Sequence, residues 1–130
     1  MPGSQPLSRI MPGLVSVSFR RLTPARIVEL VSTAQLVGIE WGGDIHVPHG
    51  DLARAKEVSR ITRDAGLSIA AYGSYFEVGK SEADGLLFDS VLETAVSLGA
   101  PLIRVWAGST GPAQTDADTR RCIIKDSERI

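Results

Sequence analysis

Apolar and polar residues alternate in four short segments of the chain, and each segment precedes a stretch with the apolar spacing of a helix. The segments are 14–19, 39–41, 67–72 and 102–106. In the last of them, Ile103 and Val105 share one face of a strand, and Arg104 and Trp106 share the other. Parallel strands with helices on both faces are normally near-continuous hydrophobic runs. Alternation instead favours a closed βα barrel, in which helices cover the outside and the lumen holds a functional site.

The spacing of these segments predicts the element order βαβαβαβα. We expect helices at 24–37, 52–65, 81–98 and from about 115 to 130. Thr23 and Asp51 suit the N-caps of the first two helices, and Gly38 suits the end of the first. Eight βα units need roughly 250 residues. Four units in 130 residues therefore predict half of a TIM (β/α)8-type barrel.

One domain is expected over residues 13–130, and it represents the N-terminal half of a truncated barrel. The preceding residues 1–12 are rich in Pro, Gly and Ser and are expected to form a disordered leader. An open flavodoxin-like α/β sheet is the alternative fold. It predicts apolar runs in the central strands, which Glu40 and Arg104 interrupt. The half-barrel is therefore the favoured architecture.

The alternation also predicts which side chains face the helices. In the first strand, Val15 and Phe19 are expected on the helix side and Ser16 on the lumen side. In the third strand, Ala71 is expected on the helix side and Tyr72 on the lumen side. These assignments assume uninterrupted strands with a period of two residues.

Composition mainly excludes classes of partner. The 14 basic and 15 acidic residues give a formal net charge of −1, and the basic residues form no stripe. Neither a nucleic acid nor an anionic membrane surface is therefore expected as a partner. No stretch approaches the roughly 20 apolar residues of a membrane span. The single cysteine, Cys122, excludes an internal disulfide and fits a reducing compartment, so a cytoplasmic protein is expected.

Two charged residues stand out because a barrel would place them in its interior. Glu40 and Arg104 lie on alternate strands, and alternate strands contribute to the same layer of interior side chains. Two full charges in that interior must be paired. They either form an internal ion pair or face a substrate, the carboxylate toward hydroxyls and the guanidinium toward phosphate.

The loop 42–50 offers further candidates because it follows the C-terminal end of a strand. Its Asp44, His46 and His49 are side chains that suit divalent ions, although residues on an irregular loop need not converge. His46 fits a polar contact at the rim of a pocket as well as it fits a structural hydrogen bond. The chain contains neither GxGxxG nor GxxxxGK[ST], which argues against nucleotide binding.

Three stretches of the chain resemble the sugar phosphate isomerase/epimerase family, whose members are xylose isomerase-like TIM barrels. The stretches are GIEWGGDIHVP at 38–48, AYGSY at 71–75 and LGAPLIRVWAG at 98–108. Their order and spacing over four βα units carry the resemblance. It covers residues 13–130, which correspond to the first half of a typical member.

The resemblance implies a sugar or sugar phosphate as the small-molecule partner. It places His46, Tyr75 and Trp106 at the rim of a substrate pocket, with Glu40 and Arg104 beneath them. It also implies a divalent metal (Mn, Mg, Zn or Co) that assists proton transfer next to the sugar carbonyl. The family's metal ligands come from strands of the second half, so none is assigned in this chain and the catalytic residues stay unknown.

Two other functional classes compete with the isomerase or epimerase hypothesis. A non-catalytic half-barrel would leave the first and fourth strands as open sheet edges, and such edges pair readily with another chain. A homodimer formed through these edges is therefore one expected partnership. An endonuclease IV-like phosphodiesterase is the other alternative, and the near-neutral charge argues against it because phosphate contacts dominate nucleic-acid affinity.

Overall fold

The computed structural model describes residues 10–130, and residues 1–9 of the expected leader lie outside this range. Four parallel strands form one sheet in the order β1-β2-β3-β4. The strands are β1 (Gly13–Val15), β2 (Gly38–Gly42), β3 (Ser68–Glu77) and β4 (Ile103–Trp106). The helices are η1 (Ser16–Phe19), α1 (Pro24–Thr33), α2 (Leu52–Asp64), α3 (Phe88–Leu98), η2 (Pro112–Gln114) and α4 (Ala117–Arg129). Strands and helices therefore alternate as the sequence predicts.

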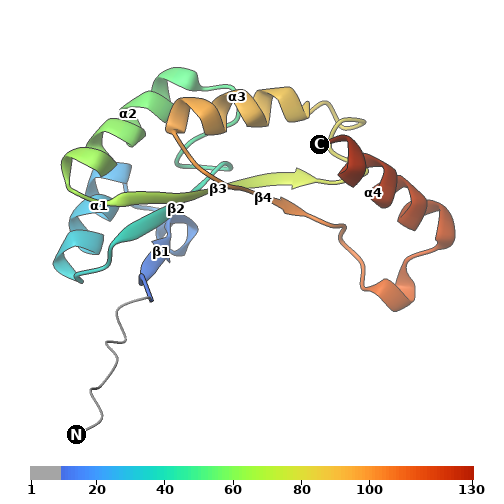
Figure 1. The fold of residues 1–130 in the computed structure, drawn as a ribbon, viewed down its shortest axis with the longest axis horizontal. Coiled ribbons are helices and arrows are strands. Elements are labelled where there is room, and N and C mark those ends of the chain that lie inside the picture. The colour runs from blue at the N-terminus through green and yellow to red at the C-terminus, as the bar shows by residue number, and fades with distance from the viewer. Residues whose placement is uncertain (1–9) are drawn as a thin grey trace, which may run out of the picture.

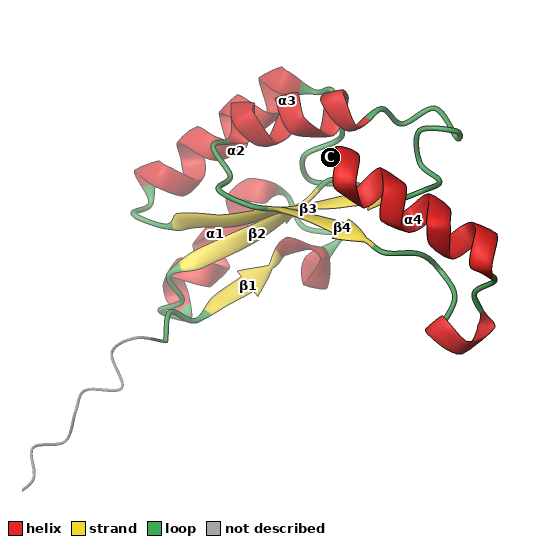
Figure 2. Ribbon diagram, turned by 45° about the vertical axis from the view of Figure 1, so that its right-hand side comes forward, coloured by secondary structure: helices red, strands yellow, loops and turns green. Residues whose placement is uncertain are grey.

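The hydrophobic core lies between the helices and one face of the sheet. Figure 1 shows α2 and α3 side by side along the strands. Ile39 and Trp41 of β2 are fully buried in the same core cluster as Ile27 of α1, Val58 of α2 and Val91 of α3. This one-sided cover matches half of a barrel and confirms the facing predicted for Ile39 and Trp41 in β2. The sheet is open, with β1 and β4 at its two edges (Figure 2).

The first strand is shorter than predicted, and its facing residues differ as a result. The strand ends at Val15 and continues as the 3-10 helix η1, which breaks the period of two. Val15 pairs in register with Glu40 and is partly exposed, as is Phe19, whereas Ser16 is fully buried. The prediction that Val15 and Phe19 face the helices and Ser16 the lumen is therefore wrong.

The third strand contains an irregularity that changes the side on which later residues lie. Ile39 pairs with Ile69, but Glu40 pairs with Ala71, so Ala70 is an extra residue in β3. A bulge of this kind reverses the alternation beyond it. Tyr72 is consequently fully buried in the core and Ala71 lies beside Glu40, the reverse of the prediction.

Two helices are shorter than their apolar spacing suggests. The first ends at Thr33 rather than at Val37, and Gln35 takes the left-handed backbone conformation (φ 58°) expected of Gly38. The third begins at Phe88 rather than at residue 81. The segment before it turns because the side chain of Ser81 accepts a hydrogen bond from the Glu77 N–H (2.7 Å). The caps at Thr23 and Asp51 form as predicted.

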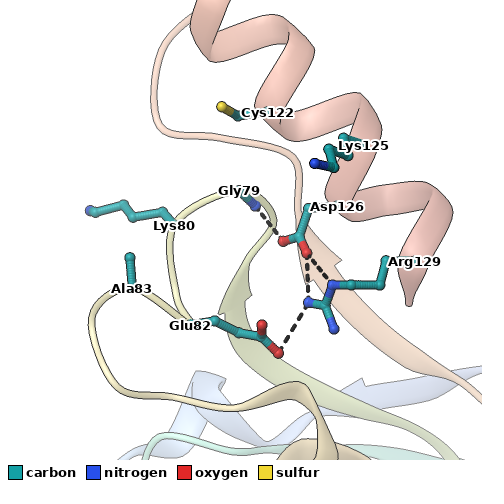
Figure 3. Close-up of a pocket in the computed structure, with 8 residues that line it drawn as sticks. All are labelled: Gly79, Lys80, Glu82, Ala83, Cys122, Lys125, Asp126 and Arg129. Atoms are coloured by element: carbon teal, nitrogen blue, oxygen red, sulfur yellow. Dashed lines mark hydrogen bonds and ion pairs between the residues drawn. The ribbon is translucent and has the colours of Figure 1, made fainter.

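Helix α4 packs against the core through Ile123, its polar side chains bond to the segment after β3, and each of its residues keeps some exposure. The Gly79 N–H donates to the Asp126 carboxylate at 2.6 Å, just after β3. Arg129 binds both Asp126 (2.6 Å) and Glu82 (3.0 Å), and this bridge closes one side of a hollow of about 390 Å³ (Figure 3). Hydrogen bonds to Gly79 and to Arg129 hold the pKa of Asp126 below its usual value. The charges around this hollow thus serve to anchor α4.

Candidate functional site

The open face of the sheet carries a cluster of charged and aromatic side chains from three neighbouring strands. Glu40 of β2 and Arg104 of β4 form an ion pair, with 2.9 Å between Glu40 Oε1 and Arg104 Nε. Both side chains are mostly buried, with 20% and 33% exposure. The pairing that alternate strands predict is therefore present. Among residues 10–130, the terminal nitrogens of Arg104 form no hydrogen bond, so they remain available to an anion.

Two neighbouring aromatic rings contact the Arg104 guanidinium. Its Cζ lies 5.0 Å from the centroid of the Trp106 ring and 6.0 Å from that of Tyr75. The two rings are 6.4 Å apart and tilted by 40°. Each cation–π contact at a partly exposed site contributes about 0.5–1 kcal/mol. The stacking therefore holds the guanidinium in one orientation against the open face.

Arg20 and Asp44 extend this cluster, and sequence reasoning did not assign them to the site. The Arg20 guanidinium donates to the Tyr75 hydroxyl (2.8 Å) and forms an ion pair with Asp44. The hydrogen bond that Arg20 donates to the Asp44 carboxylate raises the pKa of Arg20 further above its usual range. Arg20 directly follows the first strand segment. That position could have identified it as a site residue, because the C-terminal ends of barrel strands meet at one mouth of the barrel.

Gly73 lies beneath the ion pair and leaves room for it. It pairs with Gly42 on one side and with Arg104 on the other. A Cβ atom at this position would lie 2.6 Å from Glu40 Oε1 and 2.9 Å from Arg104 Nη2. A side chain here would therefore force the ends of both charged residues to move.

His46 does not join the cluster, contrary to its predicted place at the rim. It is 2% exposed and packs edge-on against Trp41, with ring centroids 6.0 Å apart. Its Nε2 lies 3.2 Å from the Leu22 carbonyl, and its Nδ1 lies 2.9 Å from Ser16 Oγ, which in turn accepts from the Gly42 N–H. Both ring nitrogens are thus used within the fold, which makes His46 a structural residue.

Acid should weaken the fold through the two histidines of this loop. Burial lowers the pKa of both His46 and His49 below the usual 6.5. Below pH 6.5 the unfolded chain therefore binds protons that the folded chain does not, so the free energy of unfolding falls as pH decreases toward the lowered values. We expect the urea midpoint to drop between pH 7.5 and 5.5. The drop should be smaller in a His46→Gln variant, and an equal drop would contradict the assignment.

The described residues do not form a site for a divalent metal. Within residues 10–130, no three His, Cys, Asp or Glu side chains come together as a ligand set. Asp44 and Glu40 are each paired with an arginine, and the ring nitrogens of His46 are both hydrogen-bonded. Asp44, His46 and His49 therefore do not converge on an ion, and we derive no chemistry through a metal here.

A polar hollow of about 330 Å³ opens where β3 and β4 end. Glu77, which pairs with Trp106 across the two strands, lines it together with Gly108. Charged, hydroxyl and amide side chains supply the rest of its polar lining: Lys80, Asp116, Ser109, Thr110, Gln114, Thr115 and Thr119. The cluster on the open face and this hollow therefore lie at the same end of the sheet.

Comparison with known proteins gives a clear answer for the fold. No family model matches the chain. No curated protein matches it either. Among solved structures, it resembles a putative xylose isomerase from Rhodospirillum rubrum, with a TM-score of 0.71 and 18% sequence identity. The match covers 92% of this chain and 47% of that protein, so the chain spans about half its length.

This chain has the fold of half a xylose isomerase-like TIM barrel. The four-stranded parallel sheet and its one-sided helices correspond to four of the eight βα units of such a barrel. The open flavodoxin-like sheet, which has helices on both faces, does not describe it. At 18% identity the likeness concerns the fold. Within residues 10–130, each helix is too short or too polar to cross a membrane.

Proposed function

We propose that this chain is half of a sugar isomerase or epimerase barrel and that its open face binds a sugar or sugar phosphate. The observation that carries the proposal is the cluster around Arg104, in which a guanidinium with free terminal nitrogens lies next to two neighbouring aromatic rings. The fold likeness to a protein described as a putative xylose isomerase supports the same class of ligand. A cytoplasmic setting is part of the proposal.

Each side chain of the cluster has a distinct role in this proposal. The terminal nitrogens of Arg104 donate to phosphate or ring oxygens, because a guanidinium presents a planar fork that matches an oxyanion. Glu40 holds Arg104 through Oε1 and accepts from sugar hydroxyls through its other oxygen. Tyr75 and Trp106 contact the apolar face of the sugar ring. Arg20 fixes the Tyr75 hydroxyl.

Catalysis in this proposal belongs to a complete barrel rather than to the four units described here. A divalent metal (Mn, Mg, Zn or Co) is assigned to strands that the chain does not contain, because the residues present do not fit one. The role proposed for this half is to bind and orient the substrate. The prediction that follows is that the 130-residue chain does not interconvert an aldose and a ketose when Mn²⁺ or Mg²⁺ is added. Turnover above the buffer rate would contradict it.

Ligand binding itself can be tested directly with the wild-type chain. We expect isothermal titration calorimetry to detect ribose 5-phosphate binding more tightly than ribose, because only the phosphate engages the full charge of Arg104. Amide NMR spectra should shift at Tyr75, Gly73 and Trp106. Amides of α2, on the opposite layer, should stay unchanged. If neither sugar shifts the amides of the open face, the proposed binding role is wrong.

A further inference from the structure

The open face carries apolar side chains that a closed barrel would bury. Val15, Leu102 and Trp106 are 39%, 66% and 47% exposed. Val15 pairs in register with Glu40, and Leu102 and Trp106 lie on the same side of β4 as Arg104. In a complete barrel, side chains at such positions form the packed interior layers. The polar cluster therefore lies on a face that would line the interior of a closed barrel, and the four strands of one copy cover only one side of that interior.

Both edges of the sheet present unpaired backbone groups. The carbonyls of Leu102 and Trp106 accept hydrogen bonds from the N–H groups of Tyr72 in β3 and of Val78 just after it, at 2.8 Å each. Because alternate residues of a parallel strand bond to opposite neighbours, Ile103 and Val105 direct their N–H and C=O groups toward the open edge. At the other edge, the Pro12 carbonyl accepts from the Val37 N–H (2.9 Å), so Gly13 and Val15 face outward.

We propose that two copies of this chain close one eight-stranded barrel, with β4 of each copy beside β1 of the other. A two-fold axis parallel to the strands keeps all eight strands parallel and satisfies both edges of both sheets at once. The second copy is the fitting occupant because the chain matches 47% of a whole barrel and thus supplies half of the needed strands. The inference concerns the sheet edges and does not depend on the proposed ligand.

Charge permits this arrangement. The cluster contains two arginines, Arg20 and Arg104, and two carboxylates, Glu40 and Asp44, which pair within one copy. Two such clusters can therefore face one another across a lumen without net repulsion between them. Closure would also cover the exposed rings and leave one continuous interior lined by two copies of the cluster.

The test is the mass of the purified chain by size exclusion with light scattering. We expect a single species of twice 13.9 kDa. Leu102→Lys adds a charge at a side chain that is exposed in one copy, so it should halve the mass without unfolding the chain. Ala53→Lys, which adds the same charge to an exposed position on α2, should leave the mass doubled.

Hydrogen exchange provides the second measurement, because it reports on the edges themselves. In the wild-type dimer the Val15 and Val105 amides should be protected, and in Leu102→Lys they should exchange freely. The Tyr72 amide, which bonds to Leu102 within one copy, should stay protected in both. A monomer with unprotected edge amides overturns the proposal, as does a dimer in which those amides remain unprotected. A broad distribution of large aggregates would show open-ended edge pairing and would overturn it as well.

Discussion

An Arg104→Ala variant is expected to bind ribose 5-phosphate roughly ten- to a hundredfold more weakly than the wild-type chain. The terminal nitrogens of Arg104 have no hydrogen-bond partner among residues 10–130, while Nε is held by Glu40. A hydrogen bond to a charged group contributes about 1.5–3 kcal/mol, and about 1.4 kcal/mol corresponds to a tenfold change in Kd. Calorimetric titration of both proteins checks this result. Ribose, which lacks the phosphate, should lose less affinity.

Further variants separate charge from geometry at this position. Arg104→Lys keeps the positive charge but not the planar fork, so its affinity should fall between wild type and Arg104→Ala. Gly73→Ala keeps both charges and forces the ends of Glu40 and Arg104 to shift, which should weaken binding while the chain stays folded. Arg60→Ala removes an exposed arginine of α2 and serves as the control. Unchanged affinity in Arg104→Ala would place the phosphate elsewhere.

A Trp41→Ala variant is expected to lose about 3–5 kcal/mol of unfolding free energy. Trp41 is fully buried at the centre of the core and contacts the His46 ring edge-on. Small domains are typically stable by only about 5–15 kcal/mol. The substitution would therefore remove a large share of the total free energy of unfolding. Urea denaturation followed by far-ultraviolet circular dichroism, at a fixed low protein concentration, measures the shift in midpoint.

The second tryptophan and a conservative substitution give matched controls. Trp106→Ala removes a half-exposed ring and should cost about 1 kcal/mol or less. Trp41→Phe removes the buried indole N–H, which has no hydrogen-bond partner in the described part of the chain. The relief of that buried polar group offsets part of the lost packing, so the net change should stay within about 1–2 kcal/mol. Equal losses in Trp41→Ala and Trp106→Ala would contradict this account of the core.

Part of the candidate site can be predicted from the sequence because it depends on strand order. Glu40 and Arg104 were expected to meet, since each is the polar residue of an alternating strand and the two strands are alternate ones. Tyr75 and Trp106 join them on the same face. The binding role of these four residues remains a prediction. Arg20 was missed as a member because its contact with Tyr75 spans 55 positions of the chain.

The sequence misplaced His46 for a related reason. Its loop does follow a strand end, where barrel sites lie, but the loop folds back over the core rather than over the open face. Ser16 Oγ and the Leu22 carbonyl bond to its two ring nitrogens, and Ser16 belongs to a segment that was predicted as a strand but forms the helix η1. A histidine in such a loop can be buried over the core or exposed at the open face. The path of η1 decides between them, because it places Ser16 next to the His46 ring.

The sequence by itself determined the order of strands and helices, the one-sided burial and hence the half-barrel architecture. Hydrophobic periodicity encodes these features locally, since each strand or helix must bury its own apolar face. The tertiary structure decided where the strands end and which alternate residues of each strand face the core. The extra residue Ala70 in β3 and the early end of β1 at Val15 depend on hydrogen bonds with neighbouring strands. Because those bonds join residues far apart in the chain, no local pattern records them.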